Sequence, residues 1–169
     1  MYHDGTKWAA ATWLAKPLGT EDRLSVWGAN VDKTLTFYIT GTQAGGSSAM
    51  TRCTLGSTIA CTNHTGVENS RGLGSVFGTL TSAGKQGPLW ASVQAVYQDP
   101  EDIYYNAGNT KTWSTKGPKG CKDQNGTPCG NTSAETLDME GSTASDVWLV
   151  GSAGLILRYD GKAWKRHHN

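Results

Sequence analysis

Three carboxylates stand together in the segment QDPED: Asp99, Glu101 and Asp102. A pair of carboxylates can serve glycoside hydrolysis, one as acid and the other as nucleophile or base. Here the acids lie in a proline-containing turn between two predicted strands, a setting typical of solvated loop charges. We therefore predict no catalytic residue in this segment.

The loop Asp123–Thr127 (DQNGT) carries alternating oxygen donors, as a fragment of a calcium-binding loop would. The full pattern needs a closing Glu at its twelfth position, and that residue is missing. We interpret the loop as a turn between two cysteines. Neither a metal site nor a cofactor is predicted.

The four cysteines form two matching pairs, Cys53 with Cys61 and Cys121 with Cys129, and each pair encloses seven residues. Zinc sites favour shorter spacings and further Cys or His ligands, which these pairs lack. A short polar loop suits a disulfide when its turn brings the two α-carbons within about 7 Å. We predict two local disulfides and hence an oxidising setting, extracellular, periplasmic or at the cell surface.

The chain has 7 Trp and 6 Tyr, whose flat rings suit either sugar stacking or a packed core. Trp13, Trp90 and Trp113 stand beside polar loop residues, and we predict that they contact a ligand together with Tyr105. Four others lie in strand-like runs and are predicted to be buried: Trp27, Tyr104, Trp148 and Trp164.

Composition narrows the function classes. With 15 basic and 14 acidic residues in 169, the net charge of +1 lacks the basic surplus expected of a nucleic-acid-binding protein. No apolar run approaches the roughly 20 residues that span a bilayer, so membrane insertion is not expected. The chain opens on polar residues rather than on a secretory leader.

Short runs rich in Val, Ile, Thr, Tyr and Trp recur between Gly, Asn, Asp and Ser, which predicts an all-β protein of many short strands. The predicted strands are Leu24–Asn30, Thr34–Thr40, Ser75–Thr81, Leu89–Tyr97, Asp102–Asn106, Val147–Val150, Leu155–Tyr159 and Ala163–Arg166. No stretch holds the apolar spacing of an amphipathic helix.

The sequence also repeats itself. YHDGTKW near the start matches RYDGKAW near the end at Asp, Gly and Trp, and in both Asp-Gly favours a hairpin turn. A second repeat consists of a short hydrophobic segment followed by a loop and an aromatic strand, and it is anchored on Trp27, Phe77, Tyr97 and Glu140. These repeats predict one domain over residues 1–169, built from a single sheet-forming unit used several times.

The segment Ser145–Trp164 (SDVWLVGSAGLILRYDGKAW) resembles one blade of a bacterial secreted β-propeller, a family with recurring D-V-W-x-V-G and Y-D-G-x-x-W motifs. The match is fair in Asp102–Trp113, which is similar to the Asp-box of sialidase-like propellers, loose in Leu24–Gly41 and poor in Ala44–Gly72. The resemblance implies a β-propeller, or part of one, with about three to four irregular four-stranded blades. It also implies that the two ends share a blade or belong to a larger propeller.

Three functions follow from the resemblance and the residues. We expect a secreted or surface-exposed, non-catalytic module whose partner is a glycan or another surface polymer. The alternative is a structural unit that associates with copies of itself or with further blades. A sialidase-like hydrolase is less favoured, since none of the five arginines stands in a recognisable motif.

Overall fold

The computed structural model describes residues 2–3, 8–9, 23–42, 48–64, 67, 72–93, 95–96, 103–108, 113–117 and 134–167. In this part of the chain the regular structure is antiparallel β-sheet, with a single short 3-10 turn, η3 (Ser152–Gly154). The all-β prediction is confirmed. No helix in the described ranges is long and apolar enough to cross a bilayer.

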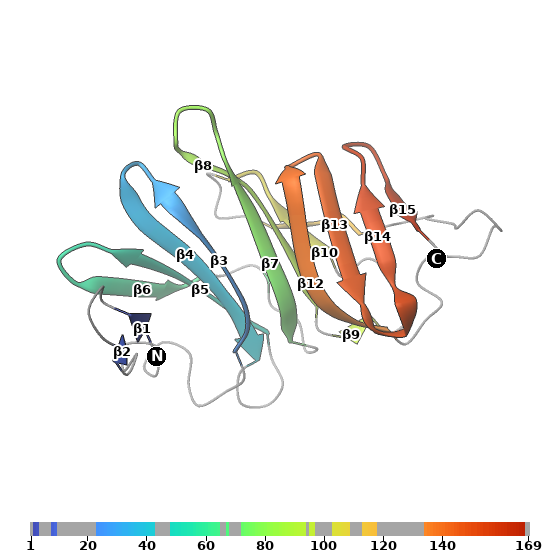
Figure 1. The fold of residues 1–169 in the computed structure, drawn as a ribbon, viewed down its shortest axis with the longest axis horizontal. Coiled ribbons are helices and arrows are strands. Elements are labelled where there is room, and N and C mark those ends of the chain that lie inside the picture. The colour runs from blue at the N-terminus through green and yellow to red at the C-terminus, as the bar shows by residue number, and fades with distance from the viewer. Residues whose placement is uncertain are drawn as a thin grey trace.

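The strands form three large sheets and one small hairpin (Figure 1). Sheet I contains β3 (Arg23–Val31), β4 (Thr34–Thr42), β5 (Ser48–Leu55) and β6 (Ile59–Asn63). Sheet II contains β7 (Leu73–Leu80), β8 (Gln86–Val93), β10 (Ile103–Asn106) and β11 (Ser114–Thr115). Sheet III contains β12 (Ala134–Thr143), β13 (Asp146–Gly151), β14 (Ile156–Tyr159) and β15 (Trp164–Arg166), with β9 (Ala95–Val96) added beside β12. The small hairpin pairs β1 (Tyr2–His3) with β2 (Trp8–Ala9).

The same meander is used three times. In each sheet the strands are hydrogen-bonded in chain order, from a first strand (β3, β7 or β12) outward. These first strands lie side by side, since β7 packs against β3 and β4 on one side and against β12 on the other. Figure 1 shows the three sheets in a row, with sheets I and III at opposite ends, and the described strands do not close a ring.

The predicted strands mostly match observed ones, with two differences. The predicted run Leu89–Tyr97 is divided, because β8 ends at Val93 and β9 pairs with β12 in the next sheet. Four observed strands were not predicted, since their sequences, rich in small and polar residues, lack a hydrophobic alternation strong enough to indicate a strand. They are β5, β6, β11 and β12.

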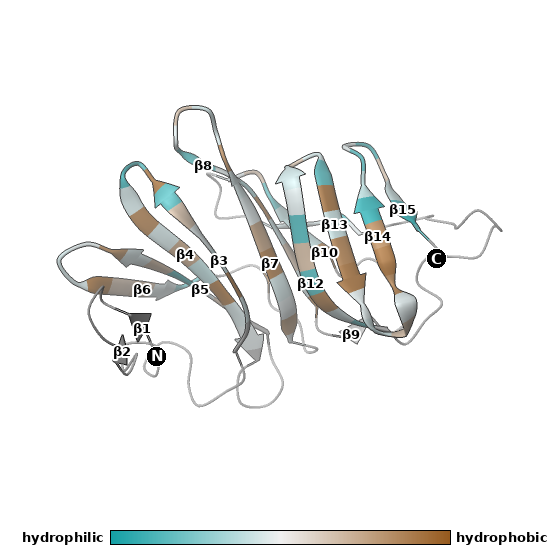
Figure 2. Cartoon of the chain, in the orientation of Figure 1, coloured by the Kyte–Doolittle hydropathy of each residue, from teal (hydrophilic) through white to brown (hydrophobic). Residues whose placement is uncertain are grey.

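The core is divided between the two spaces that separate the sheets. Between sheets I and II, Tyr38 and Met50 pack with Leu73, Val76 and Leu89. Between sheets II and III lies a larger cluster of ten buried residues: Phe77, Trp90, Ile103, Met139, Val147, Leu149, Leu155, Leu157, Tyr159 and Trp164. Hydrophobic bands along β7, β13 and β14 mark this arrangement in Figure 2. Sheet II is thus buried on both faces.

An aromatic ring packs over a glycine of the next sheet at both interfaces. A Cβ on Gly78 of β7 would lie 2.7 Å from ring atoms of Trp27, which belongs to β3. A Cβ on Gly141 of β12 would lie 2.9 Å from a ring atom of Phe77, which belongs to β7. In β12 the position of Trp27 and Phe77 is occupied by Glu140. Its side chain is exposed on the face of sheet III that points away from sheet II. Three of the four predicted anchors of the repeat, Trp27, Phe77 and Glu140, therefore occupy equivalent positions. The fourth, Tyr97, lies outside the described residues.

Buried and half-buried hydroxyls also join neighbouring sheets. The Ser25 hydroxyl accepts a hydrogen bond of 3.3 Å from the backbone N–H of Val76, which links sheet I to sheet II. Ser75 and Ser92 are 2.8 Å apart through their hydroxyls, and Ser92 donates to the Thr136 hydroxyl of sheet III at 3.0 Å. These bonds satisfy polar groups that would otherwise be costly to bury.

The two Asp-Gly-Trp segments both form hairpins. His3 pairs with Trp8 between β1 and β2, and Tyr159 pairs with Trp164 between β14 and β15. Of the two alternatives that the resemblance implies for the chain ends, a shared blade is not found among the described strands, and membership of a larger propeller stays a prediction. In the described part of the chain, β1 and β2 pair with each other and not with any strand of sheet III.

The disulfide predicted between Cys53 and Cys61 is confirmed. The two residues are cross-strand partners on β5 and β6, and their α-carbons are 4.1 Å apart. The bond ties the two outer strands of sheet I and packs with Phe37, Ile39 and Ile59.

Candidate functional site

A cavity that is open to solvent lies on the surface where the first hairpins of sheets I and II meet. It is lined by Asn30, Asp32 and Lys33 from the β3–β4 hairpin and by Ala83 and Gly84 from the β7–β8 turn, and its volume is about 580 Å³. Four of the five lining residues are exposed, so the cavity is shallow rather than enclosed. The cavity is at the ends of neighbouring first strands, so residues distant in sequence reach it together.

The β3–β4 hairpin holds its polar residues in an uncommon conformation. Val31 pairs with Thr34, so Asp32 and Lys33 form a two-residue turn with φ values of 47° and 65°. Hairpins favour this turn, in which both central residues have positive φ, but a lysine rarely occupies it. The Asp32 N–H donates to the Gly84 carbonyl at 2.9 Å, which fixes the hairpin against its neighbour.

The cavity offers donors and acceptors side by side. The Asn30 amide can both donate and accept, the Asp32 carboxylate accepts, and the Lys33 ammonium donates. Such a mixture suits a ligand with several hydroxyl groups. The sequence contains a signal for this site, the turn-forming segments Asn30–Lys33 and Ala83–Gly84, but turn chemistry alone did not indicate that the two turns meet.

The expectation of a ligand-contacting ring at Trp90 has to be corrected. Trp90 is 0% exposed and belongs to the core between sheets II and III. Its ring centroid lies 4.7 Å from that of Tyr105, 4.8 Å from that of Tyr159 and 5.7 Å from that of Trp164. Because Trp90 is the cross-strand partner of Phe77, it faces sheet III rather than solvent.

Tyr105 is half-buried at the rim of the same cluster. The Lys116 ammonium nitrogen lies 3.9 Å from the centroid of the Tyr105 ring, a favourable cation–π distance. The Lys116 carbonyl accepts a hydrogen bond of 2.8 Å from the Trp164 indole. Lys116 therefore fastens the end of β11 to sheet III, and a ligand role for Tyr105 stays a prediction.

Trp113 is half-buried at the other face of sheet II. Its indole N–H donates to His64 Nδ1 at 3.0 Å, and the two rings meet nearly edge to face. His64 also lies beside Tyr38, with ring centroids 5.8 Å apart. Trp113 thus joins sheets I and II, and its contact with a ligand stays a prediction.

The aromatic residues predicted to be buried occupy different positions. Trp27 contacts both core clusters, Tyr104 packs between sheets I and II, and Trp164 is buried between sheets II and III. Trp148 requires a correction. It is half-buried on the outer face of sheet III, away from sheet II, because its cross-strand partner is Glu140.

Other predicted features lie outside the described residues. They are Trp13, the pair Cys121 and Cys129, the loop Asp123–Thr127, and the carboxylates Asp99, Glu101 and Asp102. The predicted ligand-binding residues that are described do not line the hairpin-tip cavity.

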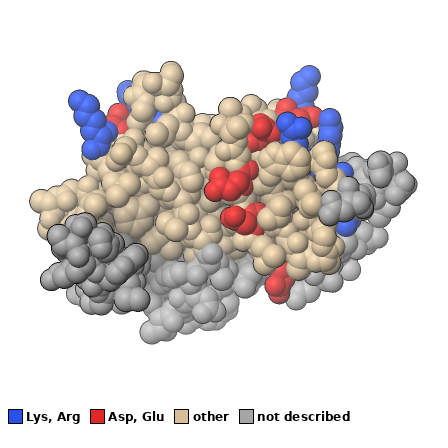
Figure 3. Space-filling model, viewed as in Figure 1, with Lys and Arg blue, Asp and Glu red and all other residues tan. Residues whose placement is uncertain are grey.

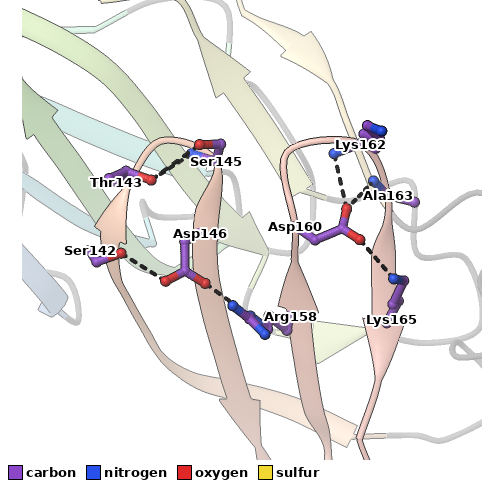
Figure 4. A network of polar contacts seen from close by, with 9 residues as sticks. All are labelled: Ser142, Thr143, Ser145, Asp146, Arg158, Asp160, Lys162, Ala163 and Lys165. Atoms are coloured by element: carbon purple, nitrogen blue, oxygen red, sulfur yellow. Dashed lines mark hydrogen bonds and ion pairs between the residues drawn. The ribbon is translucent and has the colours of Figure 1, made fainter.

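Two carboxylates organise the turns of sheet III (Figure 4). Asp146 accepts from the Ser142 hydroxyl at 2.7 Å and from Arg158 at 2.9 Å, and these bonds lower the pKa of its carboxyl. Asp160 pairs with Lys165 at 2.8 Å and accepts from the N–H groups of Lys162 and Ala163. The bond from Lys165, followed by these two backbone bonds, lowers the pKa of Asp160 far below its usual range.

A depressed pKa makes stability dependent on pH. Folding stabilises the ionised form of the Asp160 carboxyl. Its contribution to the free energy of unfolding is therefore complete above the unfolded-state pKa of about 3.9, and it is lost progressively as the pH falls below that value. We expect the thermal midpoint of the chain to fall from pH 4 to pH 2, and to fall less steeply in Asp160→Asn. The Asn variant keeps an acceptor for the turn but does not titrate. Equal slopes for the two proteins in a differential scanning calorimetry series would contradict this assignment.

Comparisons with known proteins give no relative for this chain. No family model matches it, and no curated protein or solved structure does either. The likeness to secreted β-propellers therefore stays a prediction, and the function has to be argued from the geometry.

Proposed function

We propose that this chain is a secreted or surface-exposed, non-catalytic β-propeller-type module that binds a glycan in the hairpin-tip cavity. Support for the architecture comes from the three meandering sheets, whose first strands β3, β7 and β12 lie next to one another. The four-stranded blades of a β-propeller are likewise arranged side by side, around a central channel. The Cys53–Cys61 disulfide favours an oxidising compartment.

The single observation that carries the ligand proposal is the lining of the cavity. Asn30, Asp32 and Lys33 place an amide, a carboxylate and an ammonium group around a space of about 580 Å³. Neighbouring hydroxyls of a sugar can donate to the carboxylate and the amide oxygen while accepting from the ammonium and the amide nitrogen. Recognition would then depend on directional hydrogen bonds.

A glycan array followed by isothermal titration calorimetry tests the proposal. We expect at least one class of saccharide to bind, and Asn30→Ala and Asp32→Asn each to weaken its binding about tenfold, as the loss of one good hydrogen bond does. Asp32→Asn retains a residue that tolerates positive φ, so the turn should persist.

Lys162→Ala is the matched control, because Lys162 is exposed in a turn of sheet III and does not line the cavity. It should bind as the wild type does. The proposal fails if no saccharide binds, or if the two cavity variants bind as tightly as the control.

A further inference from the structure

A histidine and a tryptophan join the outer edges of sheets I and II. His64 follows β6 and Trp113 precedes β11, and each of these strands is the last of its sheet. The Trp113 indole N–H donates to His64 Nδ1 at 3.0 Å, and the two ring centroids are 5.6 Å apart. At the inner edge the sheets meet through their first strands, where β7 packs against β3 and β4. The bond therefore closes the space between the sheets at the edge farthest from their first strands.

The bond requires a neutral imidazole. An indole nitrogen can only donate, so His64 Nδ1 must accept, and the proton of the neutral ring is on Nε2. A protonated imidazole carries N–H groups on both nitrogens and has no acceptor left. Protonation of His64 would therefore place two N–H donors against each other. The ordinary pKa of histidine, about 6.5, brings this change between pH 5 and pH 8.

The groups of the described residues that face His64 favour its neutral form. The centroid of its ring lies 5.8 Å from that of Tyr38 on β4. Arg52 on β5 is the cross-strand partner of both Tyr38 and Thr62, so its cation lies on the same face of sheet I and opposes a second positive charge. Burial raises the pKa of Tyr38, and Arg52 lowers it in part, so the hydroxyl stays protonated in acid and cannot balance an imidazolium.

The carboxylates of the described residues are far from this edge. Figure 3 shows acidic side chains over sheet III. The β3–β4 turn also holds one, but it is at the opposite end of sheet I, where Leu55 pairs with Ile59, whereas the His64 N–H bonds to the Met50 carbonyl. The described carboxylates are Asp32, Glu135, Asp138, Glu140, Asp146 and Asp160.

We propose that the His64–Trp113 bond is an acid-sensitive clasp between the outer edges of sheets I and II. Protonation of the imidazole breaks the bond, and the Trp113 ring then separates from sheet I. β11 stays in place, because it pairs with β10 and because the Lys116 carbonyl still accepts from the Trp164 indole. The first strands β3 and β7 also keep their contact, so acid opens the outer edge without unfolding the sheets.

Heteronuclear NMR of the wild-type chain between pH 8 and pH 5 tests the clasp. The Trp113 indole proton, assigned through the backbone of its own residue, should shift upfield as its hydrogen bond is lost. The midpoint should lie below about 6.5, because the bond opposes protonation, and the His64 imidazole protons should titrate with the same midpoint. A Trp113 signal that does not move in this range overturns the clasp, as does a midpoint different from that of His64.

His64→Gln is the matched variant, with circular dichroism verifying its fold. Its amide oxygen can accept from the Trp113 indole but does not titrate, so the Trp113 signal should stay in place from pH 8 to pH 5. A signal that shifts in the variant as it does in the wild type overturns the clasp. Asn30→Ala should titrate as the wild type does, because the hairpin-tip cavity is at the other end of sheet I, and this separates the clasp from the glycan proposal.

Stability supplies a readout that a merely structural bond would not move. Because folding favours the neutral imidazole, its contribution is complete above about pH 6.5 and declines as the pH falls. From pH 7.5 to pH 5 the unfolding equilibrium constant from urea titrations should rise about fivefold in the wild type and less than about twofold in His64→Gln. His167→Gln, which removes a histidine beside Trp148 on sheet III, should keep the wild-type dependence. Equal dependence in His64→Gln and the wild type overturns the clasp.

Discussion

Trp90→Ala is expected to lower the free energy of unfolding by about 4 kcal/mol, as truncation of a large buried aromatic residue does. Trp90 is 0% exposed and contacts Tyr105, Tyr159 and Trp164 at once. Its removal leaves a cavity in the space that joins sheets II and III. Among the described residues sheet III has no other large core, so its packing on sheet II should loosen first.

Guanidinium unfolding followed by far-UV circular dichroism measures this effect without relying on the deleted fluorophore. Trp90→Phe is the matched control. It keeps a ring in the site and deletes an indole N–H that has no hydrogen-bond partner among the described residues, so a smaller loss of about 1–2 kcal/mol is expected. If Trp90 contacted a ligand from an exposed position, Trp90→Ala would reduce binding with little change in stability, contrary to this prediction.

The repeating strands could be predicted from sequence because their signal is local. Segments such as Thr34–Thr42 and Asp146–Gly151 combine β-branched and aromatic residues with sharp turn signals on either side. The disulfide between Cys53 and Cys61 was equally accessible, since a short polar loop between two cysteines already favours the pairing.

The exposure of single rings could not be predicted in the same way. Trp90 and Trp148 both occupy the second strand of a meander, and both are flanked by apolar residues in sequence. One faces the next sheet and the other faces outward, because sheet III follows sheet II on one side and no described sheet covers the other. Burial here depends on which sheets are neighbours, and that information is not local.

The candidate site had the same difficulty. From the sequence alone, Asn30 and Asp32 are ordinary turn-forming residues, and Gly84 is the turn glycine of another hairpin. Only the packing of β3 against β7 brings the two turns together around a cavity. The ligand prediction rests on aromatic residues, and those that are described lie at the interfaces between sheets. The polar cavity instead lies at the ends of the first strands.

Gly78→Val is expected to lower the free energy of unfolding by about 3 kcal/mol. A Cβ at this position would lie 2.6 Å from Leu89 Cδ2 and 2.7 Å from two ring atoms of Trp27, so the added side chain must displace the indole. Overpacking a tight interface typically costs about 1–3 kcal/mol, and Trp27 contacts both core clusters, so the upper end applies.

Gly56→Val is the matched control for the loss of glycine itself. The nearest atom to a Cβ at Gly56 is the Thr58 carbonyl oxygen at 3.8 Å, an ordinary contact, so a change within about 0.5 kcal/mol is expected. Urea unfolding of both variants compares them, and tryptophan fluorescence reports whether the Trp27 ring moves toward solvent. Equal stability of the two variants would mean that the ring does not depend on the glycine. The contact that relates sheet I to sheet II, and by repetition sheet II to sheet III, would then have no role in their assembly.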